Sequence, residues 1–343
     1  MPPSVSIIVP CFNEQATIGG LLEAILAQTY PVERMEVIIA DGLSTDTTRE
    51  RIAAFSQQHP ELAVRVIDNP ARSIPRGLNL AIAAAQGSTL LRLDAHSSPH
   101  SEYVARSLQA LDEDKGWNVG GVWEIRPGQD TWLARAIAAA AAHPFGVGDA
   151  RYRYTTQAGA VDTVPFGAFR RNLIERIGAF DETLQTNEDY EFNARIRLTG
   201  GTVWLDPAIR SAYYARPTLG ALARQYWRYG YWKWRMLRRY PDTLRPRQAI
   251  PPLFVLALLG LSGLSLLWAP ATWPLGAVVV SYTLLLLAAA VQKAIQLQQP
   301  SLLLGMPLAM MIMHLSWGGA FLWSLISSLT STPGAHANGT NPV

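Results

Sequence analysis

Three carboxylates each follow a short apolar run near the start of the chain. Glu14, Asp41 and Asp94 come within a few residues of runs that are partly β-branched. Carboxylate oxygens accept hydrogen bonds from hydroxyl and N–H groups, and they hold divalent cations against phosphates. This arrangement indicates a nucleotide ligand, in which one carboxylate binds the base or ribose and another binds a metal ion.

The segments that must position these carboxylates alternate between strand and helix patterns. Short apolar runs predict buried strands, and the stretches between them predict helices that Asn13 and Asp46 cap. Alternation at this spacing predicts βαβ units in an α/β fold with a mostly parallel sheet. Since ligands bind at the carboxyl ends of such strands, the carboxylates are expected at one edge of the sheet. The predicted strands are 5–9, 36–40, 64–68 and 89–93, and the predicted helices are 13–28, 47–58 and 76–85.

Other features exclude several classes of protein. No G-x-G-x-x-G follows the first strand and no G-x-x-x-x-G-K-[ST] occurs in the sequence, which argues against dinucleotide oxidoreductases and P-loop NTPases. The single cysteine, Cys11, excludes an internal disulfide framework. The net charge of +3 is too small to indicate nucleic acid as a partner.

Charge divides the 343 residues into three regions. Residues 1–205 carry 18 Lys/Arg and 24 Asp/Glu, residues 206–248 carry 10 and 2, and residues 249–343 carry only Lys293. The expected parts are a globular domain over 1–215, a basic aromatic segment over 216–248, three membrane-spanning helices within 249–330, and a polar tail over 331–343.

The last third of the chain has the composition of membrane-spanning helices. About 20 apolar residues suffice to cross a bilayer, and the runs 250–269, 272–291 and 302–329 reach that length. The alternative, a hydrophobic soluble domain, needs a polar outer face. Lys293, the one charged residue in 249–343, cannot supply such a face.

The placement of Lys and Arg predicts the orientation. Arginines cluster just before the first predicted span, and Lys293 lies between the second and third. Because these residues favour the cytoplasmic side, the first domain and the loop 292–301 are expected in the cytoplasm. Met1–Pro10 lacks the basic start of a signal peptide. The expected location is the inner (cytoplasmic) membrane, as a multi-pass protein.

The segment 216–248 combines arginines with tyrosines and tryptophans. Such side chains favour the headgroup level, so an interfacial helix in contact with membrane lipids is expected. The alternative is a soluble helix with packed tryptophans. His314, inside the third span, is expected to make a packing hydrogen bond.

Seven segments resemble, in chain order, the motifs of family 2 glycosyltransferases, which have the GT-A fold. The resemblance covers about residues 4–235 and is greatest to the ExoA-like subgroup of succinoglycan biosynthesis. Each segment alone is a weak signal, but their order makes the resemblance specific. The segments are Val9–Glu14, Ala40–Asp46, Leu93–His96, Asp162–Gly167, Gly178–Glu182, Asn187–Glu191 and Gln225–Gly230.

The resemblance implies a binding site for a nucleotide-sugar donor, a UDP-sugar. Pro10, Asn13 and Glu14 would surround the base and ribose, and Asp41 would accept a hydrogen bond from the uracil. From the residues alone, Glu14 also fits the first turn of a helix. Asp41 also fits a turn before Gly42.

Asp94 and His96 occupy the D-x-D position of the family. The resemblance implies that Asp94 binds near the ribose and that both residues hold a divalent cation, Mn²⁺ or Mg²⁺, at the diphosphate. Many members have Asp where this chain has His96, and imidazole suits Mn²⁺ better than Mg²⁺. His96 alone would also fit a plain polar loop position.

Asp189, next to Glu188, occupies the family position of the general base. It would take the proton of the acceptor hydroxyl as that oxygen attacks C1 of the donor sugar, with inversion at C1. Glu188 and Glu191 are expected to raise its pKa by like-charge repulsion. The alternative is an acidic helix start placed for the helix dipole.

Five further residues receive roles. Arg228 resembles a diphosphate-contacting residue of membrane synthases, with lipid phosphate as the alternative ligand. Arg72 and Arg76 flank the donor side and are expected to meet phosphate, or to be plain surface charge. Phe166 and Gly167 would form a floor on the acceptor side.

Together these implications predict an inverting hexosyltransferase. It would transfer a hexose, with UDP-glucose as the expected donor, to a polyprenyl-linked saccharide in exopolysaccharide or cell-surface glycan synthesis. One alternative is transfer to polyprenyl phosphate itself. Another is a non-catalytic partner of a polysaccharide synthase complex, against which the presence of both Asp94 and Asp189 argues.

Overall fold

The computed structural model describes residues 3–243 and 245–330, so the predicted polar tail, 331–343, lies outside the described residues. The chain divides into two compact units. The first comprises residues 1–126 and 141–215, and the second comprises residues 127–140 and those from 216 onward. Residues 127–140, expected within the first domain, therefore belong to the second unit.

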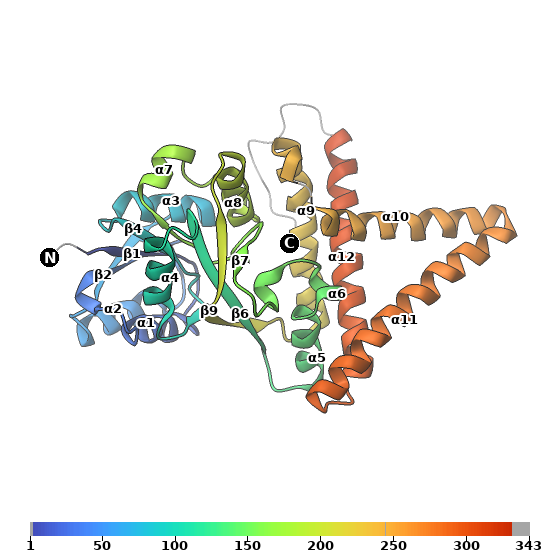
Figure 1. The fold of residues 1–343 in the computed structure, drawn as a ribbon, viewed down its shortest axis with the longest axis horizontal. Coiled ribbons are helices and arrows are strands. Elements are labelled where there is room, and N and C mark those ends of the chain that lie inside the picture. Colours follow the sequence, from blue (N-terminus) through green and yellow to red (C-terminus); the bar gives the residue numbers. More distant parts are fainter. Residues whose placement is uncertain (1–2, 244, 331–343) are drawn as a thin grey trace. The chain divides into compact units, whose positions relative to one another are not determined.

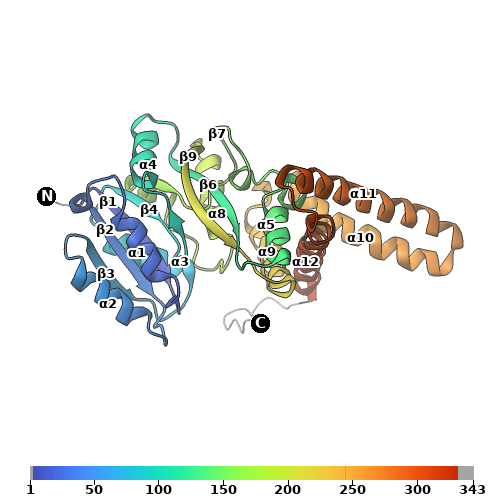
Figure 2. The ribbon, with the colours of Figure 1, turned by 90° about the horizontal axis from the view of Figure 1, so that it is seen from below.

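The first unit is built around one mixed sheet (Figure 1, Figure 2). In the described part of the chain, the sheet has nine strands in the order β3-β2-β1-β4-β8-β6-β9-β5, with β7 beside β9. The strands are β1 (Val5–Cys11), β2 (Met35–Asp41), β3 (Ala63–Asp68), β4 (Thr89–Arg92), β5 (Ser98–Pro99), β6 (Asn118–Pro127), β7 (Gly159–Ala160), β8 (Ala168–Arg170) and β9 (Val203–Ala215).

Strands β1 to β4 form the parallel half of the sheet. Their register places Cys11 opposite Asp41, and Asp41 opposite Asp68. Strands β1 and β2 are buried along almost their whole length, as expected for parallel strands that are covered on both faces. The parallel βαβ core predicted from the sequence is confirmed.

Helices cover both faces of this half, and alternate residues of β1 point to opposite faces. Ile7 and Val9 pack against α1, α2 and α4, whereas Ile8 packs against α3, α7 and α8. Figure 1 shows α3 and α7 on one side of the strands and α1 and α2 on the other. The helices of the first unit are α1 (Ile18–Leu26), α2 (Thr48–Gln58), α3 (Ile74–Ala84), α4 (Tyr103–Asp112), α6 (Pro144–Val147), α7 (Asn172–Ile177) and α8 (Glu188–Leu198).

Two helices begin later than predicted. Helix α1 starts at Ile18 rather than beside Asn13, because Asn13 adopts a left-handed conformation with φ 53°. Helix α2 starts at Thr48, and Asp46 accepts a hydrogen bond from the Thr48 N–H at 3.0 Å without being the N-cap residue. The two polar side chains shape the loops at the strand ends.

Beyond β4 the strands run antiparallel, which the sequence did not predict. Strand β8 pairs with β4 and β6, and β5 and β7 pair with β9. Strands β5 and β7 have two residues each and β8 has three. Segments this short carry no readable periodicity.

The second unit consists of long helices, with α9 packed along α12. A Cβ on Gly230 would lie 2.1 Å from the carbonyl oxygen of Trp317, so a glycine is needed for this close approach. Trp234 Nε1 donates a hydrogen bond to Ser328 Oγ at 2.9 Å. The helices are α9 (Leu219–Arg239), α10 (Pro246–Leu267), α11 (Thr272–Leu297) and α12 (Leu302–Thr330), together with most of α5 (Trp132–Ala141).

The helix predicted over 216–248 is interrupted. Helix α9 ends at Arg239, and α10 begins at Pro246. One face of α9 packs on α12 through residues that include Tyr226 and Trp234, whereas Trp227 remains 42% exposed. Helix α9 is therefore packed on one face, as in the alternative of a helix with packed tryptophans, and also carries an exposed aromatic side chain.

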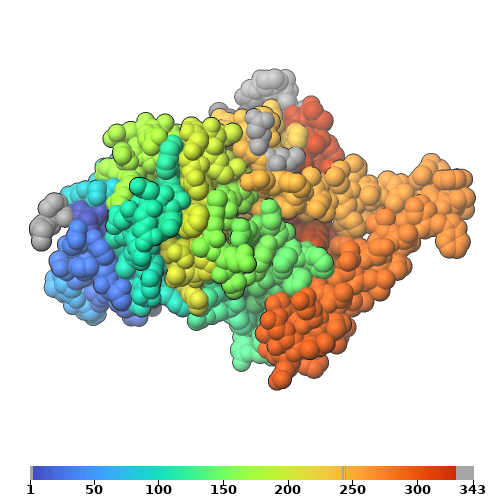
Figure 3. All heavy atoms as spheres, viewed as in Figure 1, coloured from blue at the N-terminus to red at the C-terminus, as the bar shows by residue number. Residues whose placement is uncertain are grey.

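Three helices of the described chain are long and apolar enough to cross a membrane: Pro246–Leu267, Ala269–Leu297 and Leu302–Leu329. They lie in the three predicted regions. Large apolar side chains of α10 and α11 are widely exposed, and Figure 3 shows how much of these two helices is uncovered. Extended apolar surface of this kind suits contact with lipid.

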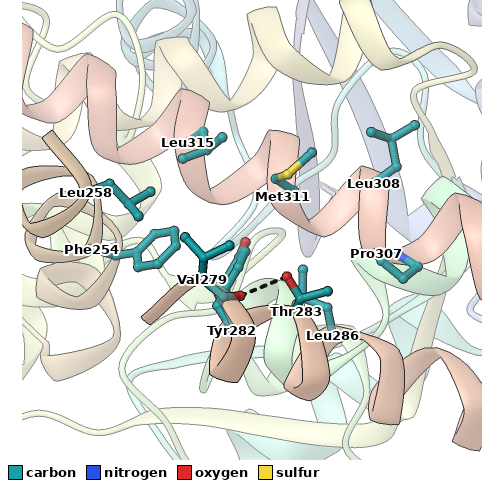
Figure 4. A pocket seen from close by; sticks show the side chains of 10 residues that line it. All are labelled: Phe254, Leu258, Val279, Tyr282, Thr283, Leu286, Pro307, Leu308, Met311 and Leu315. Atoms are coloured by element: carbon teal, nitrogen blue, oxygen red, sulfur yellow. Dashed lines mark hydrogen bonds between the residues drawn. The ribbon is translucent and has the colours of Figure 1, made fainter. Parts of the chain in front are cut away.

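An apolar pocket of about 340 Å³ lies between α10, α11 and α12 (Figure 4). Aliphatic and aromatic side chains provide most of its lining. The Tyr282 hydroxyl and His314 Nδ1 lie 2.9 Å apart and join α11 to α12. This hydrogen bond is the packing interaction expected of His314.

Candidate active site

The carboxyl ends of the parallel strands carry several of the predicted site residues. Pro10 lies in β1 opposite Ala40, and Asp41 ends β2. Arg92 ends β4, and Asp94 follows two residues later. The parallel register therefore brings residues from distant parts of the sequence to one edge of the sheet.

The loops after β1 and β2 are bound to one another through Asn13. Its Oδ1 accepts a hydrogen bond from the Thr45 N–H at 2.8 Å, and its own N–H donates to Ser44 Oγ at 2.8 Å. A left-handed conformation is tolerated by asparagine better than by most residues. Asn13 thus organises the edge that was predicted to surround the base and ribose.

An exposed aromatic ring lies beside these loops. Phe12 is 41% exposed, and the guanidinium carbon of Arg72 is 5.0 Å from its ring centroid. Arg72 Nε also donates to the Gly42 carbonyl at 3.1 Å. A planar base can stack on such a ring, so Arg72 supports a stacking surface in addition to carrying charge.

Asp41 is fully buried and holds its own loop in place. Its carboxylate accepts hydrogen bonds from the Ser44 N–H at 3.0 Å, the Ser44 hydroxyl at 2.5 Å and Arg49 Nε at 2.5 Å. Arg49 also binds Asp68 at 2.6 Å. A carboxylate offers about four acceptor positions, and these bonds occupy three of them; the side chain is fully buried in this structure.

Glu14 and His96 are brought together from positions 82 residues apart. Glu14 Oε1 lies 2.9 Å from His96 Nδ1, and its Oε2 accepts from the Thr17 hydroxyl at 2.5 Å. His96 is about half exposed. The predicted ribose carboxylate and the predicted metal ligand are therefore direct neighbours.

The only cysteine lies beneath this edge. Burial, together with the charges of Asp41 and Glu14, raises the pKa of the Cys11 thiol to about 12. A thiol with so high a pKa stays protonated at neutral pH and is a poor nucleophile. Cys11 therefore serves packing.

Arg92 joins the strand edge to the start of α8. Its side chain is almost completely buried, and Nη2 donates to Asp94 Oδ1 at 3.1 Å and to Glu188 Oε1 at 2.8 Å. Burial lowers the pKa of Arg92, but the charges of Asp94, Glu188 and Asp189 raise it more strongly. The guanidinium is thus a permanent cation among three carboxylates.

Asp189, in the first turn of α8, is partly buried next to Glu188. Burial and the Glu188 charge raise the pKa of Asp189 from its ordinary value near 4 to about 7, although Arg92 acts in the opposite direction. Glu191, also expected to raise it, is instead paired with Arg195 at 2.5 Å. Asp189 has the environment of a base that works near neutral pH.

The donor set suits a metal ion that is held mainly by its substrate. Within the described residues no group of three or more His, Cys, Asp or Glu side chains could hold an ion. Mg²⁺-type sites commonly use one or two protein ligands plus substrate phosphates, and Asp94 and His96 can supply two. Glu14 binds the imidazole of His96, as carboxylates do for metal-binding histidines.

Among the other predicted residues, Gly167 adjoins this cluster, because its carbonyl accepts a hydrogen bond from the Arg92 N–H at 2.9 Å. Arg76 pairs with Glu182 at 3.1 Å. Phe166 is buried in the core, and a Cβ on Gly167 would lie 2.1 Å from Asn118 Oδ1, so this glycine accommodates a side chain of the protein. Arg228 lies in α9, in the second unit.

Two residues at the site, Arg49 and Arg92, were missed by the sequence analysis, and Phe12 was included only as part of the segment Val9–Glu14. The signal for Arg92 was a charged residue inside an otherwise apolar strand, Thr89–Arg92, where an arginine needs a partner. Phe12 and Arg49 carried no such signal, because an aromatic residue in a loop and an arginine in a helix are ordinary.

The mixed sheet, with acidic side chains at its parallel strand ends, defines the GT-A class of fold. A mannosyltransferase of Pyrobaculum calidifontis, whose structure was solved with GDP-Man and Mn²⁺, has a similar fold: the TM-score is 0.60 at 22% identity, over 94% of this chain and 88% of that one. The sequence profile described as Glycosyl transferase family 2 matches residues 6–178. The chain belongs to glycosyl transferase family 2.

Two relatives place the chain more closely within the family. The succinoglycan biosynthesis protein ExoA of Rhizobium meliloti is 28% identical over 93% of this chain and 94% of its own length. A dolichyl N-acetyl-α-D-glucosaminyl phosphate 3-β-D-2,3-diacetamido-2,3-dideoxy-β-D-glucuronosyltransferase of Methanococcus voltae is 28% identical over 68% of this chain and 74% of its own. The resemblance stated from the motifs is confirmed.

Proposed function

We propose that this protein is an inverting glycosyltransferase that moves a hexose from a UDP-sugar to a polyprenyl-linked saccharide. The expected donor is UDP-glucose. The observation that carries the proposal is the buried cluster at the start of α8. There the proposed base, Asp189, lies with Glu188 and Arg92, and Arg92 in turn binds the donor-side carboxylate Asp94. A carboxylate whose pKa is raised to about 7 can act as a general base near neutral pH, which supports a transferase over a non-catalytic partner.

The donor would bind along the strand edge. The uracil would stack on Phe12 beside Arg72, and its imide N–H would donate to Asp41. Pro10, Asn13 and Glu14 would surround the base and ribose. Arg76 and Arg228 remain proposed as phosphate contacts.

Transfer requires one proton to leave as one bond forms. The acceptor hydroxyl oxygen attacks C1 of the sugar, its proton passes to Asp189, and the bond from C1 to the diphosphate oxygen breaks, so that UDP leaves. Attack on the face opposite the leaving group inverts C1. An α-linked donor therefore gives a β-linkage.

A divalent cation, Mn²⁺ or Mg²⁺, fits this site. Asp94 and His96 would hold it, and when bound it would stabilise the charge that grows on the departing diphosphate. His96 favours Mn²⁺, since imidazole is a better ligand for Mn²⁺ than for Mg²⁺.

A lipid-linked acceptor is supported by the second unit and by the relatives. Three helices long and apolar enough to cross a membrane would keep the enzyme beside its acceptor, with the first unit in the cytoplasm. The name of the Methanococcus voltae relative describes transfer to a sugar that is already carried on a lipid phosphate. This favours a saccharide acceptor over polyprenyl phosphate itself, and Phe166 and Gly167 remain assigned to the acceptor side.

The test is a donor panel with the full chain purified in detergent. UDP- and GDP-sugars are incubated with Mn²⁺ or Mg²⁺, with and without a lipid extract, and release of the nucleotide diphosphate is measured. We expect turnover of one UDP-sugar, stimulated by lipid extract, and a glycolipid product that is larger by one hexose. Binding of UDP without turnover of any sugar would favour a non-catalytic partner, and a lipid carrying a single sugar would favour polyprenyl phosphate as acceptor.

A further inference from the structure

Arg92 connects two parts of the site that are 96 residues apart in the sequence. One nitrogen, Nη2, donates both to Asp94 Oδ1 at 3.1 Å and to Glu188 Oε1 at 2.8 Å, and Nε adds a contact with Asp94 at 3.3 Å. Arg92 ends β4 and Glu188 begins α8. One rigid, planar group thus sets the distance between the donor carboxylate and the segment that carries the proposed base.

The charge balance makes this bridge necessary. Asp94, Glu188 and Asp189 would be three neighbouring negative charges, of which Glu188 is buried and Asp94 and Asp189 are partly buried. Within the described residues, Arg92 is the cation that forms ion pairs with Asp94 and Glu188. Removing one member of a buried ion pair leaves an uncompensated charge and is costly.

The hydrogen bonding of Arg92 is incomplete. In the described structure its Nη1 is buried and has no hydrogen-bond partner, whereas buried donors are normally satisfied. An arginine whose task is stability alone would be expected to use both terminal nitrogens in a bidentate pair. Here Nη2 bridges two carboxylates and Nε adds a second contact with Asp94, so the separation of those carboxylates decides the position of the guanidinium.

We propose that Arg92 is a positioning residue of the transfer reaction, which holds Asp94 and Glu188 so that the donor sugar and the base Asp189 face each other at reacting distance. This inference rests on the proposed function. Arg92 acts through the two carboxylates and need not touch the substrate.

The expected consequence is a loss of kcat that exceeds the loss of donor binding. A displacement of about 1 Å at a reacting centre costs on the order of 100-fold in rate. The nucleotide contacts assigned to Phe12 and Asp41 do not involve Arg92. Asp94 is the assigned donor contact that Arg92 does hold, so nucleotide affinity should fall far less than kcat.

The experiment compares Arg92→Met and Arg92→Lys with the wild-type full chain in detergent. UDP titration counts the folded, binding-competent protein, and kcat and the donor KM are referred to that count. We expect Arg92→Met to have a kcat about 100-fold below that of the wild type, with the UDP Kd within about threefold. Arg92→Lys should have a kcat at least about tenfold above that of Arg92→Met, because the positive charge returns. Arg65→Met, which removes an arginine paired with the buried Glu36 at 2.9 Å, is the matched control and should retain the wild-type kcat.

A second comparison covers the case in which Arg92→Met does not fold. Glu188→Gln keeps a hydrogen-bond acceptor, and it is combined with Arg92→Lys in a double-mutant cycle. If Arg92 acts through Glu188, the double variant loses less rate than the product of the single losses.

The inference is overturned if folded Arg92→Met keeps its kcat, if kcat falls only as far as UDP binding falls, or if the cycle is additive. A wild-type chain that transfers no sugar from any donor would instead overturn the proposed function.

Discussion

Asp189 owes its properties as a base to its neighbours. In water an aspartate is ionised above pH 4 and is too weakly basic to remove a hydroxyl proton efficiently. At the start of α8, burial and the adjacent Glu188 raise its pKa to about 7, and Arg92 keeps it from rising further. Burial and the Glu188 charge, opposed by Arg92, therefore set the base strength.

Substitution of this base separates catalysis from binding. Asp189→Asn removes proton acceptance with little change of shape, so we expect kcat to fall by about 10²–10⁴-fold and UDP affinity to stay within about threefold. Nucleotide release and UDP titration measure the two. Asp114→Asn, in the turn after α4 where φ is 50°, is the control, because asparagine tolerates this conformation. A normal rate in Asp189→Asn would place the base elsewhere.

The raised pKa of Asp189 also predicts the pH dependence of transfer. The base must be ionised, so the rate should fall as the pH drops below about 7, by about tenfold per pH unit. Glu188→Gln removes the like charge that raises this pKa, so the acid limb should move to lower pH. A pH–rate profile of kcat for both proteins checks the prediction, and an acid limb that stays in place or moves upward would contradict it.

At the scale of elements, the contact between α9 and α12 depends on one glycine. The Trp317 carbonyl occupies the space that a side chain at Gly230 would need. Since the obstacle is backbone, it cannot move aside as a flexible side chain would.

We therefore expect Gly230→Ala to destabilise the second unit by about 1–3 kcal/mol, the usual cost of overpacking. Thermal unfolding of the detergent-solubilised chain measures the effect. Gly260→Ala in α10 is the matched control, because no atom lies within 4 Å of its Cβ position, and it should leave the midpoint unchanged or raise it. Equal midpoints for the two variants would show that α9 and α12 do not pack this closely.

At the scale of the whole molecule, the chain joins a nucleotide-sugar unit to a helical unit that is almost free of charge. The basic residues before α10 and Lys293, near the end of the second candidate span Ala269–Leu297, lie on the side that the positive-inside rule assigns to the cytoplasm. The first unit is expected on that side, where nucleotide sugars are available.

Cysteine labelling can test this orientation, because the natural Cys11 is buried and its thiol has a pKa of about 12, which keeps background labelling low. A membrane-impermeant maleimide should label Gln296→Cys from the cytoplasmic side of sealed vesicles. It should label Ala269→Cys from the opposite side only. Labelling of both positions from the same side would contradict the three-span topology.

The sequence by itself determined the parallel half of the sheet and the three apolar spans. Both depend on local sequence alone: the composition of the run from Val5 to Val9 predicts a strand, and the length of the apolar run 302–329 predicts a membrane span. The ordered motifs also determined the family, since each motif is a short contiguous segment. Helix starts were harder to predict, because Asn13 binds the loop after β2 instead of capping a helix, and Asp46 binds both the Thr48 N–H at the start of α2 and the Gln15 N–H in the loop after β1.

Only the tertiary structure decided the antiparallel half of the sheet, the pairing of Glu14 with His96 and the bridge from Arg92 to Glu188. It also paired Arg76 with Glu182, and it added burial to the Glu188 charge that raises the pKa of Asp189. Each of these depends on contacts between segments that are far apart in the chain. Such hydrogen bonds and ion pairs form only when those segments come into contact, and so does the burial of a carboxylate. A local pattern of residue types cannot predict which distant segments come into contact.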